Sequence, residues 1–471
     1  MPGPPGGRLL VRIPTNYHAP TLSISEDGKD YAFVIQTSDG CHVVQRNQEG
    51  PAYAECGPLG FAPASPHVFY WATESVPFYK RFFHWVTHWG AAVETLPVLI
   101  ANGQQLAPGF AQAVPITFSV DGTRWAVVGK EPDRHVGDKT EVGAVAVFAD
   151  GRALGRYKDT SQPAFSPDGK HLAYLIENED GQFKLIVDGA ERRTFERQSV
   201  AAPEITQGAA GSDLTQRLRV TYLSDGTLVE IAPSRDGWTV YHDDQPLASY
   251  AHNVSMPEQG TVVRLGEMPG PSTAVFPRSL SIAAHAPVAA WWARTEGHEE
   301  HWQVARNGTP DTTVCARYRS SDLPVLSSDG RRLTYACYLH PEEQSDEVMV
   351  VADDKQFGPY ENAAGMIFSD DGGHFAYMAA DGSPPFDWSY HVDGKASPLR
   401  FEAVWQPRFN KTGTHIAWEA LRGKRPMLFL DGRGVRSFDE VLWGPMFSPE
   451  KVSWVIRRGR RIMRVEVPLE P

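Results

Sequence analysis

Hydrophobic and polar positions follow one pattern that recurs along the whole chain. Each copy opens with a hydrophobic residue, passes through a polar stretch that often contains Asp-Gly, and ends in an apolar run, as in FSPDGKHLAYL. Because Asp-Gly tolerates positive φ angles, each copy is predicted to be two strands joined by a tight turn. Five copies keep the pattern closely: Ile24–Val34, Phe118–Val128, Phe165–Leu175, Leu326–Ala336 and Phe368–Met378. Five degenerate copies begin at Phe61, Tyr222, Ile282, Phe409 and Phe447.

The apolar run after the turn alternates large and small side chains. Positions seven and nine after the opening residue are apolar in every copy and bulky in nearly all of them, as with Leu172 and Tyr174. Successive residues of a strand point to opposite faces of the sheet. We therefore expect both faces to be buried, with the bulky face of one sheet filling the shallow face of the next. Position eight is alanine in six copies: Ala32, Ala126, Ala173, Ala290, Ala376 and Ala417.

A second tight turn follows later in the unit, as in the VDG sequence around Asp188. Each unit is therefore predicted to contain four antiparallel strands, A to D, with short A–B and C–D turns and a B–C loop. Successive copies begin between 37 residues apart (Ile24 to Phe61) and 60 residues apart (Tyr222 to Ile282). Most spacings are near the 40–45 residues typical of a propeller blade. The predicted fold is an all-β propeller of about ten four-stranded blades.

The FSPDGKxxAY pattern resembles the WD40-like repeats of the TolB family and of the propeller domain of prolyl oligopeptidases. The coupled VDG turn is similar to that of tandem repeats in bacterial propeller proteins. This resemblance extends from about Ile24 to Ile456. It implies the propeller fold, but propellers with these repeats include binding proteins, scaffolds and occasional enzymes, so the fold does not define a reaction.

The two ends of the chain are predicted to meet in one blade. The tenth copy stops before a strand D, while Leu9–Ile13 is a strand-like run ahead of the first copy. Pairing of this run with the last blade would remove an exposed sheet edge. Residues 1–471 are expected to form a single propeller, and the alternative is two propellers of about five blades each with a boundary near residues 220–280.

Four long insertions occur in the connections of the repeats other than the tight A–B and C–D turns. Thr73–Thr95 and Lys130–Glu141 are predicted B–C loops, and Gln198–Arg217 and Ala251–Arg278 are predicted D–A loops. In a four-stranded antiparallel blade these two kinds of connection lie at the end opposite the A–B and C–D turns. Functional residues concentrate on loops that a rigid scaffold holds in place. We therefore expect the end with the long loops to be the recognition surface.

The first insertion contains an unusual run of aromatic residues, VPFYKRFFHWVTHWG. Aromatic and arginine side chains are enriched where protein partners bind. Packing of the aromatics against the propeller, contact with a partner or ligand, and metal binding by the two histidines all remain open, although no third metal ligand is evident nearby. The candidate binding residues are Tyr79, Arg81, Phe82, His84, Trp85, His88 and Trp89, and the candidate metal ligands are His84 and His88.

The cysteines and a basic turn are weaker candidates. Cys41 and Cys56 can face each other across a C–D hairpin, but reduced thiols are expected in the cytosol, and Cys315 and Cys337 show no such symmetry. A hairpin rich in arginine can hold an anion, although a solvated turn is the simpler interpretation. Its residues are Arg457, Arg458, Arg460 and Arg461.

The aspartates of the first turn are interpreted as turn formers rather than as metal ligands, because they are spread one per repeat. They are Asp27, Asp121, Asp168, Asp225, Asp329 and Asp371.

Composition narrows the function further. The 471 residues include 42 Gly and 37 Pro, which indicates frequent chain reversals, and carry a net charge of −12. That charge disfavours the broad basic surface that nucleic acids require. No signal peptide or membrane-spanning run is visible, so we expect a cytoplasmic protein with no membrane insertion, and a trimmed secreted form would have the same sequence features. The oligomeric state is not determined by the sequence.

Motifs of catalysis are missing from the sequence. It contains no G-x-S-x-G elbow, P-loop, dinucleotide fingerprint or H-E-x-x-H motif, and we expect no cofactor. The predicted function is therefore a non-catalytic binding or scaffolding propeller that recognises a protein or peptide. The alternative is a propeller enzyme, a lyase or hydrolase, whose histidine and acidic residues come from separate blades around the central opening.

Overall fold

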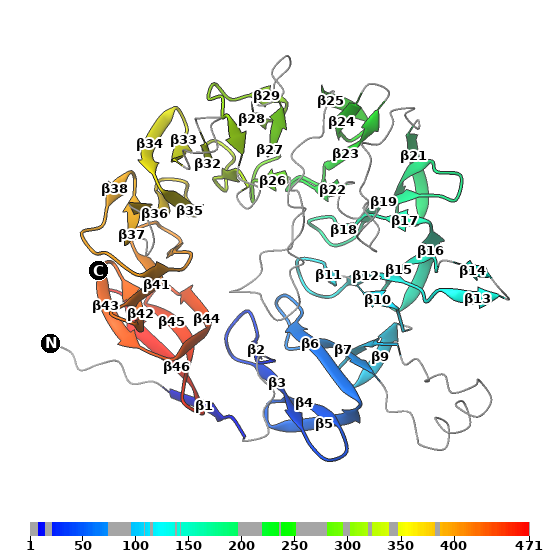
Figure 1. Cartoon of the computed structure of the whole chain (residues 1–471), viewed down its shortest axis with the longest axis horizontal. Helices are drawn as coiled ribbons and strands as arrows, with labels where there is room; N and C mark the ends of the chain where they lie inside the picture. The colour runs from blue at the N-terminus through cyan, green and yellow to red at the C-terminus, as the bar shows by residue number, and fades with distance from the viewer. Residues whose placement is uncertain are drawn as a thin grey trace. The chain divides into compact units, whose positions relative to one another are not determined.

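The computed structural model describes most of the chain as β-strands joined by turns (Figure 1). No helix occurs in the residues it describes, and thus none that is long and apolar enough to cross a membrane. The described residues are 8–14, 21–73, 96–107, 109–113, 116–136, 139–141, 143–195, 219–234, 237–250, 280–294, 302–318, 323–338, 347–381 and 387–470.

The described strands form ten antiparallel blades, each built around four strands in the order A-B-C-D, and these blades make the fold a β-propeller. In four blades strand A consists of two short pieces. Blade 1 contains β2 (Ser23–Ile24), β3 (Tyr31–Gln36), β4 (Cys41–Gln45) and β5 (Gln48–Tyr53). Blade 2 contains β6 (Glu55–Phe61), β7 (Val68–Thr73), β8 (Val98–Ala101) and β9 (Gln104–Ala107). Blade 3 contains β10 (Gln112–Ala113) with β11 (Thr117–Phe118), β12 (Trp125–Lys130), β15 (Val145–Ala149) and β16 (Arg152–Tyr157). Blade 4 contains β17 (Asp159–Thr160) with β18 (Ala164–Phe165), β19 (Leu172–Glu177), β20 (Phe183–Val187) and β21 (Ala190–Phe195).

The remaining six blades follow in chain order. Blade 5 contains β22 (Arg219–Tyr222), β23 (Leu228–Ser234), β24 (Gly237–His242) and β25 (Gln245–Tyr250), and blade 6 contains β26 (Leu280–Ile282), β27 (Ala289–Arg294), β28 (Trp302–Arg306) and β29 (Thr309–Pro310). Blade 7 contains β30 (Arg317–Tyr318) with β31 (Val325–Leu326), β32 (Leu333–Tyr338), β33 (Val348–Ala352) and β34 (Lys355–Tyr360). Blade 8 contains β35 (Asn362–Phe368), β36 (Phe375–Asp381), β37 (Asp387–Val392) and β38 (Lys395–Ala396). Blade 9 contains β39 (Ala403–Val404) with β40 (Arg408–Phe409), β41 (Ile416–Arg422), β42 (Arg425–Leu430) and β43 (Arg433–Ser437). Blade 10 contains β44 (Glu440–Phe447), β45 (Lys451–Arg458), β46 (Arg461–Pro468) and β1 (Arg8–Arg12).

The N-terminal strand completes the last blade, as the sequence predicts. β1 pairs with β46 at the edge of the sheet β1-β46-β45-β44, so the blue start and the red end of the chain lie side by side in Figure 1. Strand D of blade 10 is therefore supplied by the other end of the chain, and the outer side of β46 is not left as an open sheet edge.

Both predicted turns are present in the blades. In blade 4, Phe165 pairs with Leu172 across the A–B turn, and Gly169 in that turn has a φ of 70°. The C–D turn of the same blade places Asp188 and Gly189 at φ angles of 52° and 80°. These left-handed conformations favour Asp and Gly, which explains why the pair recurs.

The alternation of large and small side chains produces the predicted packing between blades. The six repeated alanines have no exposed surface. Ala126 and Val128 of blade 3 belong to the same buried cluster as Leu172 and Tyr174 of blade 4. The bulky face of each such blade thus fills the shallow face of the blade before it, and burial of one large side chain contributes roughly 1.5–3 kcal/mol.

The chain divides into two compact units. One unit holds Arg12–Thr194, which includes blades 1 to 4, together with Thr261–Ala274. The other holds Phe195–Gly260 and Val275–Pro471, which include blades 5 to 10, together with Met1–Val11. Whether the blades form one propeller or two stays a prediction.

Candidate functional site

The predicted aromatic binding loop lies outside the described residues. This applies to Tyr79, Arg81, Phe82, His84, Trp85, His88 and Trp89. The structure does describe the two strands that flank this insertion, β7 and β8, which are strands B and C of blade 2. The insertion therefore leaves from the B–C end of its blade, which we call the loop end, in contrast to the turn end with the A–B and C–D turns.

The second insertion, Lys130–Glu141, is partly described and has its own secondary structure. It contains β13 (Arg134–Val136) and β14 (Lys139–Glu141), which form a two-stranded hairpin separate from the blade. This hairpin connects β12 to β15, so it too belongs to the loop end. The other two insertions lie between β21 and β22 and between β25 and β26, which are D–A connections.

The turn-forming aspartates bond within their own turns. In blade 4 the Ser166 hydroxyl donates to Asp168 at 2.6 Å and the Lys170 amide donates to the same oxygen at 3.1 Å. The hydrogen bond from Ser166 is the largest cause that lowers the pKa of Asp168. Two residues before Asp225 the chain has Leu223 instead of this serine, and Asp225 accepts the Thr227 amide. The serine contact recurs at Asp27, Asp121, Asp329 and Asp371.

Three blades contain a His–Asp pair that superficially resembles part of a catalytic triad. The imidazole Nδ1 lies 2.7 Å from a carboxylate oxygen in each pair, and the second oxygen of the same aspartate accepts a backbone amide at the start of strand B. Because the same geometry recurs at the turn end of three blades, the pairs belong to the framework of the repeat. They are His171–Asp188, His374–Asp393 and His415–Asp431.

Arginines at the turn end join consecutive blades. The Arg332 guanidinium of blade 7 donates to the Asp353 carboxylate at 3.0 Å and to the Gly372 carbonyl of blade 8 at 2.9 Å. It also lies 4.9 Å from the ring centre of Phe368. Arg124 makes the equivalent contacts from blade 3 to blade 4.

The contacts of Arg332 border a cleft of about 230 Å³ between blades 7 and 8. Two carboxylates in this cleft, Asp353 and Asp393, already accept backbone amides at the start of strand B. These two carboxylates therefore support their own blades, while Arg332 joins blade 7 to blade 8. Its lining residues are Arg332, Ala352, Asp353, Asp354, Lys355, Phe357, Phe375 and Asp393.

A half-buried glutamate lies on the face of blade 9 that packs against blade 10. Glu419 is on β41, on the same face as Ala417, whose cluster includes Trp454 of blade 10. Burial raises the pKa of Glu419 to about 8. Its backbone carbonyl accepts hydrogen bonds from the Trp405 amide at 3.0 Å and from the Tyr390 hydroxyl at 3.1 Å. Glu419 is thus a neutral acid at neutral pH, but it lies apart from the His–Asp pairs of the turn end.

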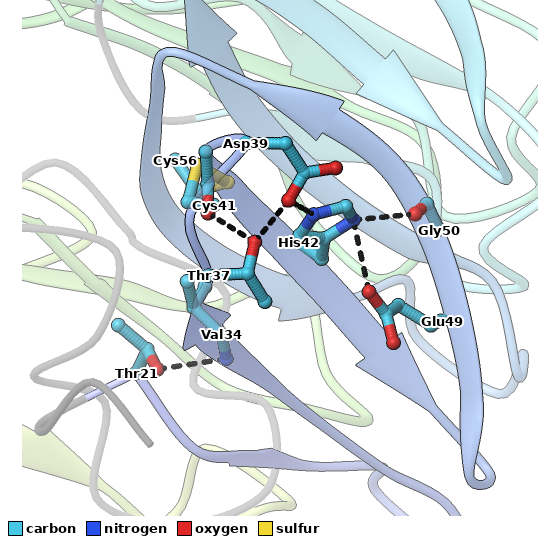
Figure 2. The surroundings of a disulfide bond; sticks show 10 residues. Thr21, Val34, Thr37, Asp39, Cys41, His42, Glu49, Gly50 and Cys56 are labelled. Atoms are coloured by element: carbon cyan, nitrogen blue, oxygen red, sulfur yellow. Dashed lines mark hydrogen bonds and ion pairs between the residues drawn. A yellow bond between two sulfur atoms is a disulfide. The ribbon is translucent and has the colours of Figure 1, made fainter. Parts of the chain in front are cut away.

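Both pairs of cysteines form disulfides, which corrects the expectation of reduced thiols. Cys41 and Cys56 do not face each other across one hairpin, because Tyr53 is the cross-strand partner of Cys41. Instead the disulfide joins β4 of blade 1 to β6 of blade 2, with Cα atoms 6.0 Å apart (Figure 2). Cys315 forms an isolated β-bridge with Trp302 of blade 6. Its sulfur forms the second disulfide, with Cys337 on β32 of blade 7.

The first disulfide lies beside a buried histidine (Figure 2). The His42 ring contacts the Gly50 carbonyl at 3.0 Å and the carboxylates of Asp39 and Glu49 at 3.2 Å each. The hydrogen bond to Gly50 is the largest cause that raises the pKa of His42, and the two carboxylates act in the same direction. These contacts connect strands C and D of blade 1, so we interpret His42 as a residue that stabilises this hairpin.

No group of three or more His, Cys, Asp or Glu side chains suited to a metal occurs among the residues that the structure describes. In that part of the chain, the histidines with carboxylate contacts are bonded within single blades. The structure therefore brings together framework residues that the sequence did not single out, chiefly Arg124, Arg332 and the histidines of the His–Asp pairs. Their signal was the residue just before strand B, which is Arg or His in six of the blades, at 67, 124, 171, 332, 374 and 415.

Comparisons with known proteins find similar chains among solved structures only. No family model matches the chain, and no curated protein matches it. Among solved structures, a eukaryotic initiation factor is 11% identical with a TM-score of 0.42, covering 86% of this chain and 90% of the other. The β-propeller domain of the trilobed protease from Pyrococcus furiosus is 11% identical with a TM-score of 0.31, covering 82% and 100%. The Dos1 propeller is 11% identical with a TM-score of 0.33, covering 76% and 93%.

Proposed function

We propose that this protein is a non-catalytic binding propeller, built from WD40-like repeats of the TolB type, that recognises a protein or peptide partner through the loop ends of its blades. The observation that carries the proposal is the unequal length of the connections at the two ends of the blades. In blade 2 the C–D turn consists of residues 102–103, whereas the B–C connection runs from residue 74 to residue 97.

The turn end supports this proposal by its chemistry. Its aspartates, arginines and histidines are engaged in hydrogen bonds and ion pairs that repeat from blade to blade, for example at Asp168, His171 and Arg332. Side chains that are already bonded within the framework of the fold are poor candidates for binding a partner. Loops on a rigid scaffold are the usual place for recognition, and here the long ones share one end of the blade.

Replacement of one insertion by a short turn tests the proposal. Residues 74–97 are exchanged for the Gly-Lys turn of β41 and β42, Gly423–Lys424. A matched control exchanges the turn-end residues Asn102–Gly103 for Asp-Gly, which keeps the positive φ angles. Tagged proteins are purified from the native host, and bound proteins are identified and quantified by mass spectrometry.

The proposal predicts a stoichiometric partner that is retained by the control and lost from the loop replacement, while both variants unfold at the temperature of the unaltered protein. A partner retained equally by both variants would contradict the proposed role of this insertion. Turnover of a small molecule, lost on replacement of a His or acidic residue, would instead favour the lyase or hydrolase alternative.

A further inference from the structure

Two neighbouring blades have paired arginines at their loop ends. In blade 9 the B–C hairpin places Arg422 directly opposite Arg425, and in blade 10 the corresponding hairpin places Arg458 directly opposite Arg461. All four side chains are exposed. Like charges that face each other across an antiparallel pair destabilise the sheet. The fold therefore carries the same unfavourable arrangement twice, in adjacent hairpins.

The carboxylates at this end of the two blades are engaged elsewhere. Glu402 accepts the Lys424 amide, Asp439 accepts the Gly459 amide, and Glu440 pairs with Arg457 at 2.7 Å. Within the described part of the chain, no ion pair joins a carboxylate to any of the four facing arginines. We call these four residues, Arg422, Arg425, Arg458 and Arg461, the basic surface.

The hairpin itself does not require positive charge at these positions. In blade 8 the residues at the corresponding place in the B–C hairpin are Asp381 and Asp387, which face each other. In blade 4 the B–C turn contains Glu179 and Asp180. The whole chain has a net charge of −12. Neither the solubility of such an acidic chain nor the formation of a B–C hairpin requires arginine at these positions. The basic surface therefore calls for another explanation.

The packing of blades 9 and 10 puts the two arginine pairs at the same end of neighbouring sheets. Ala417 of β41 and Ile456 of β45 belong to one buried cluster, and packed sheets are separated by roughly 10 Å. Trp405 on the strand A side of blade 9 is 45% exposed, and its amide bonds to Glu419, three residues before Arg422. Blade 9 thus carries an exposed tryptophan as well as two exposed arginines, and both residue types are enriched in binding hot spots.

We propose that the basic surface binds an acidic segment of a protein partner, rich in Asp and Glu. The guanidinium group presents a planar fork that matches a carboxylate, and an anion placed between facing arginines relieves their repulsion. The proposal deepens the proposed function and rests on it, because both concern the loop ends. A short acidic peptide fits two adjacent hairpins, whereas the net negative charge of the chain repels a long polyanion such as nucleic acid.

Charge reversal of one arginine in each pair gives a test that does not depend on loss of folding. In the variant Arg422→Glu/Arg458→Glu each facing pair becomes Arg–Glu, so its melting temperature should equal or exceed that of the unaltered protein. A matched control is Arg152→Glu/Lys411→Glu, two exposed cations at the turn ends of blades 3 and 9. The two variants change the net charge equally.

The probe is a fluorescein-labelled peptide of ten alternating Asp and Glu residues, whose binding to the full chain is measured by fluorescence anisotropy at several salt concentrations. We expect binding that weakens with salt, at least a tenfold loss in the Arg422→Glu/Arg458→Glu variant, and less than a twofold change in the control. Equal loss in both variants would show a general charge effect and overturn the inference. Binding of a single-stranded oligonucleotide without binding of the peptide would overturn it too.

The result separates this inference from the proposed function. If the native partner requires residues 74–97 but the peptide does not bind, the binding role stands and the basic surface is not its acidic-segment site. If the peptide binds through the four arginines but no partner depends on the long loop, the inference stands and the proposed role of that insertion fails.

Discussion

The hydroxyl oxygens of Tyr360 and Tyr377 lie 2.9 Å apart across the interface between blades 7 and 8. Tyr360 ends strand D of one blade, and Tyr377 is on the bulky face of strand B of the next. The same 17-residue separation joins Tyr157 to Tyr174, whose hydroxyls are 3.3 Å apart. Burial is the main cause that raises the pKa of Tyr377. The pair is therefore a repeated polar contact between blades, and it is neutral at physiological pH.

Replacement of Tyr377 by Phe should lower the free energy of unfolding by about 1–2 kcal/mol, because the Tyr360 hydroxyl then loses its partner inside the interface. Urea denaturation followed by tryptophan fluorescence measures the change. The double variant Tyr360→Phe/Tyr377→Phe serves as control, because removal of both hydroxyls leaves neither unpaired and should cost less than the sum of the single changes. Strict additivity in this cycle would show that the two hydroxyls do not interact.

The disulfides lead to a prediction about the native protein. Both bonds join consecutive blades, and the structure contains no free cysteine. We expect the denatured, unreduced protein from its native host to show no reactive thiol, and two bonds to appear on reduction. For Cys41–Cys56, with a sequence separation of 15, the variant Cys41→Ala/Cys56→Ala should lose about 3 kcal/mol of stability relative to the oxidised protein.

A matched measurement in reducing buffer controls for the loss of the side chains themselves. There the variant Cys41→Ala/Cys56→Ala and the unaltered protein should unfold at nearly the same denaturant concentration. Detection of four thiols in the native protein would contradict the prediction, and it would also agree with the reduced state that the sequence suggests for a cytosolic protein.

The sequence could predict features that depend on one blade. The Asp-Gly turn near Asp168 and the buried Ala173 follow from local conformational preference and from strand alternation, and both are confirmed. The pairing of β1 with the last blade follows from a missing strand D. These features repeat, so ten imperfect copies reinforce one another.

Contacts between blades were not predictable in the same way. The partner of Cys41 is set by how blade 2 packs on blade 1, which alternation within a strand does not reveal. A one-residue difference in a turn also shifts register. In blade 5 the Leu223 amide bonds to Thr227, whereas in blade 4 the Ser166 amide bonds to His171, so Glu230 takes the place of Tyr174 rather than that of an alanine. The aromatic insertion, where the sequence placed the binding residues, lies outside the described residues.

The contacts of Arg332 at the turn end predict that its substitution lowers the stability of the protein more than substitution of a neighbouring surface residue. Arg332→Ala removes the ion pair with Asp353, the bond to the Gly372 carbonyl and the contact with the Phe368 ring, so we expect a loss of about 2 kcal/mol in the free energy of unfolding. The neighbouring Arg331 is 87% exposed and forms an ion pair with Asp329 in its own turn. Arg331→Ala should change stability by less than about 0.5 kcal/mol. Equal effects of the two substitutions in urea denaturation would contradict the conclusion that Arg332 stabilises the contact between blades 7 and 8.

Glu419 predicts how stability depends on pH. Because burial raises its pKa to about 8 while a glutamate in the unfolded chain titrates near 4.3, the folded protein binds the additional proton between these values. Its contribution to stability is therefore complete below about pH 4 and is lost as the pH rises to about 8, by up to roughly 1.4 kcal/mol per pH unit. Glu419→Gln keeps the neutral form at every pH, so the slope of the free energy of unfolding between pH 5 and pH 8 should become less negative than in the unaltered protein.

Urea denaturation at each pH unit from 5 to 9 measures this slope. Glu402→Gln is the matched control, because Glu402 is an exposed glutamate of the same blade that accepts the Lys424 amide. It should leave the slope between pH 5 and pH 8 unchanged, because the side chain of Glu402 is exposed to solvent rather than packed between blades. If Glu419→Gln and Glu402→Gln give the same pH profile as the unaltered protein, Glu419 is ionised in the folded state and the interface between blades 9 and 10 must admit water to its carboxylate.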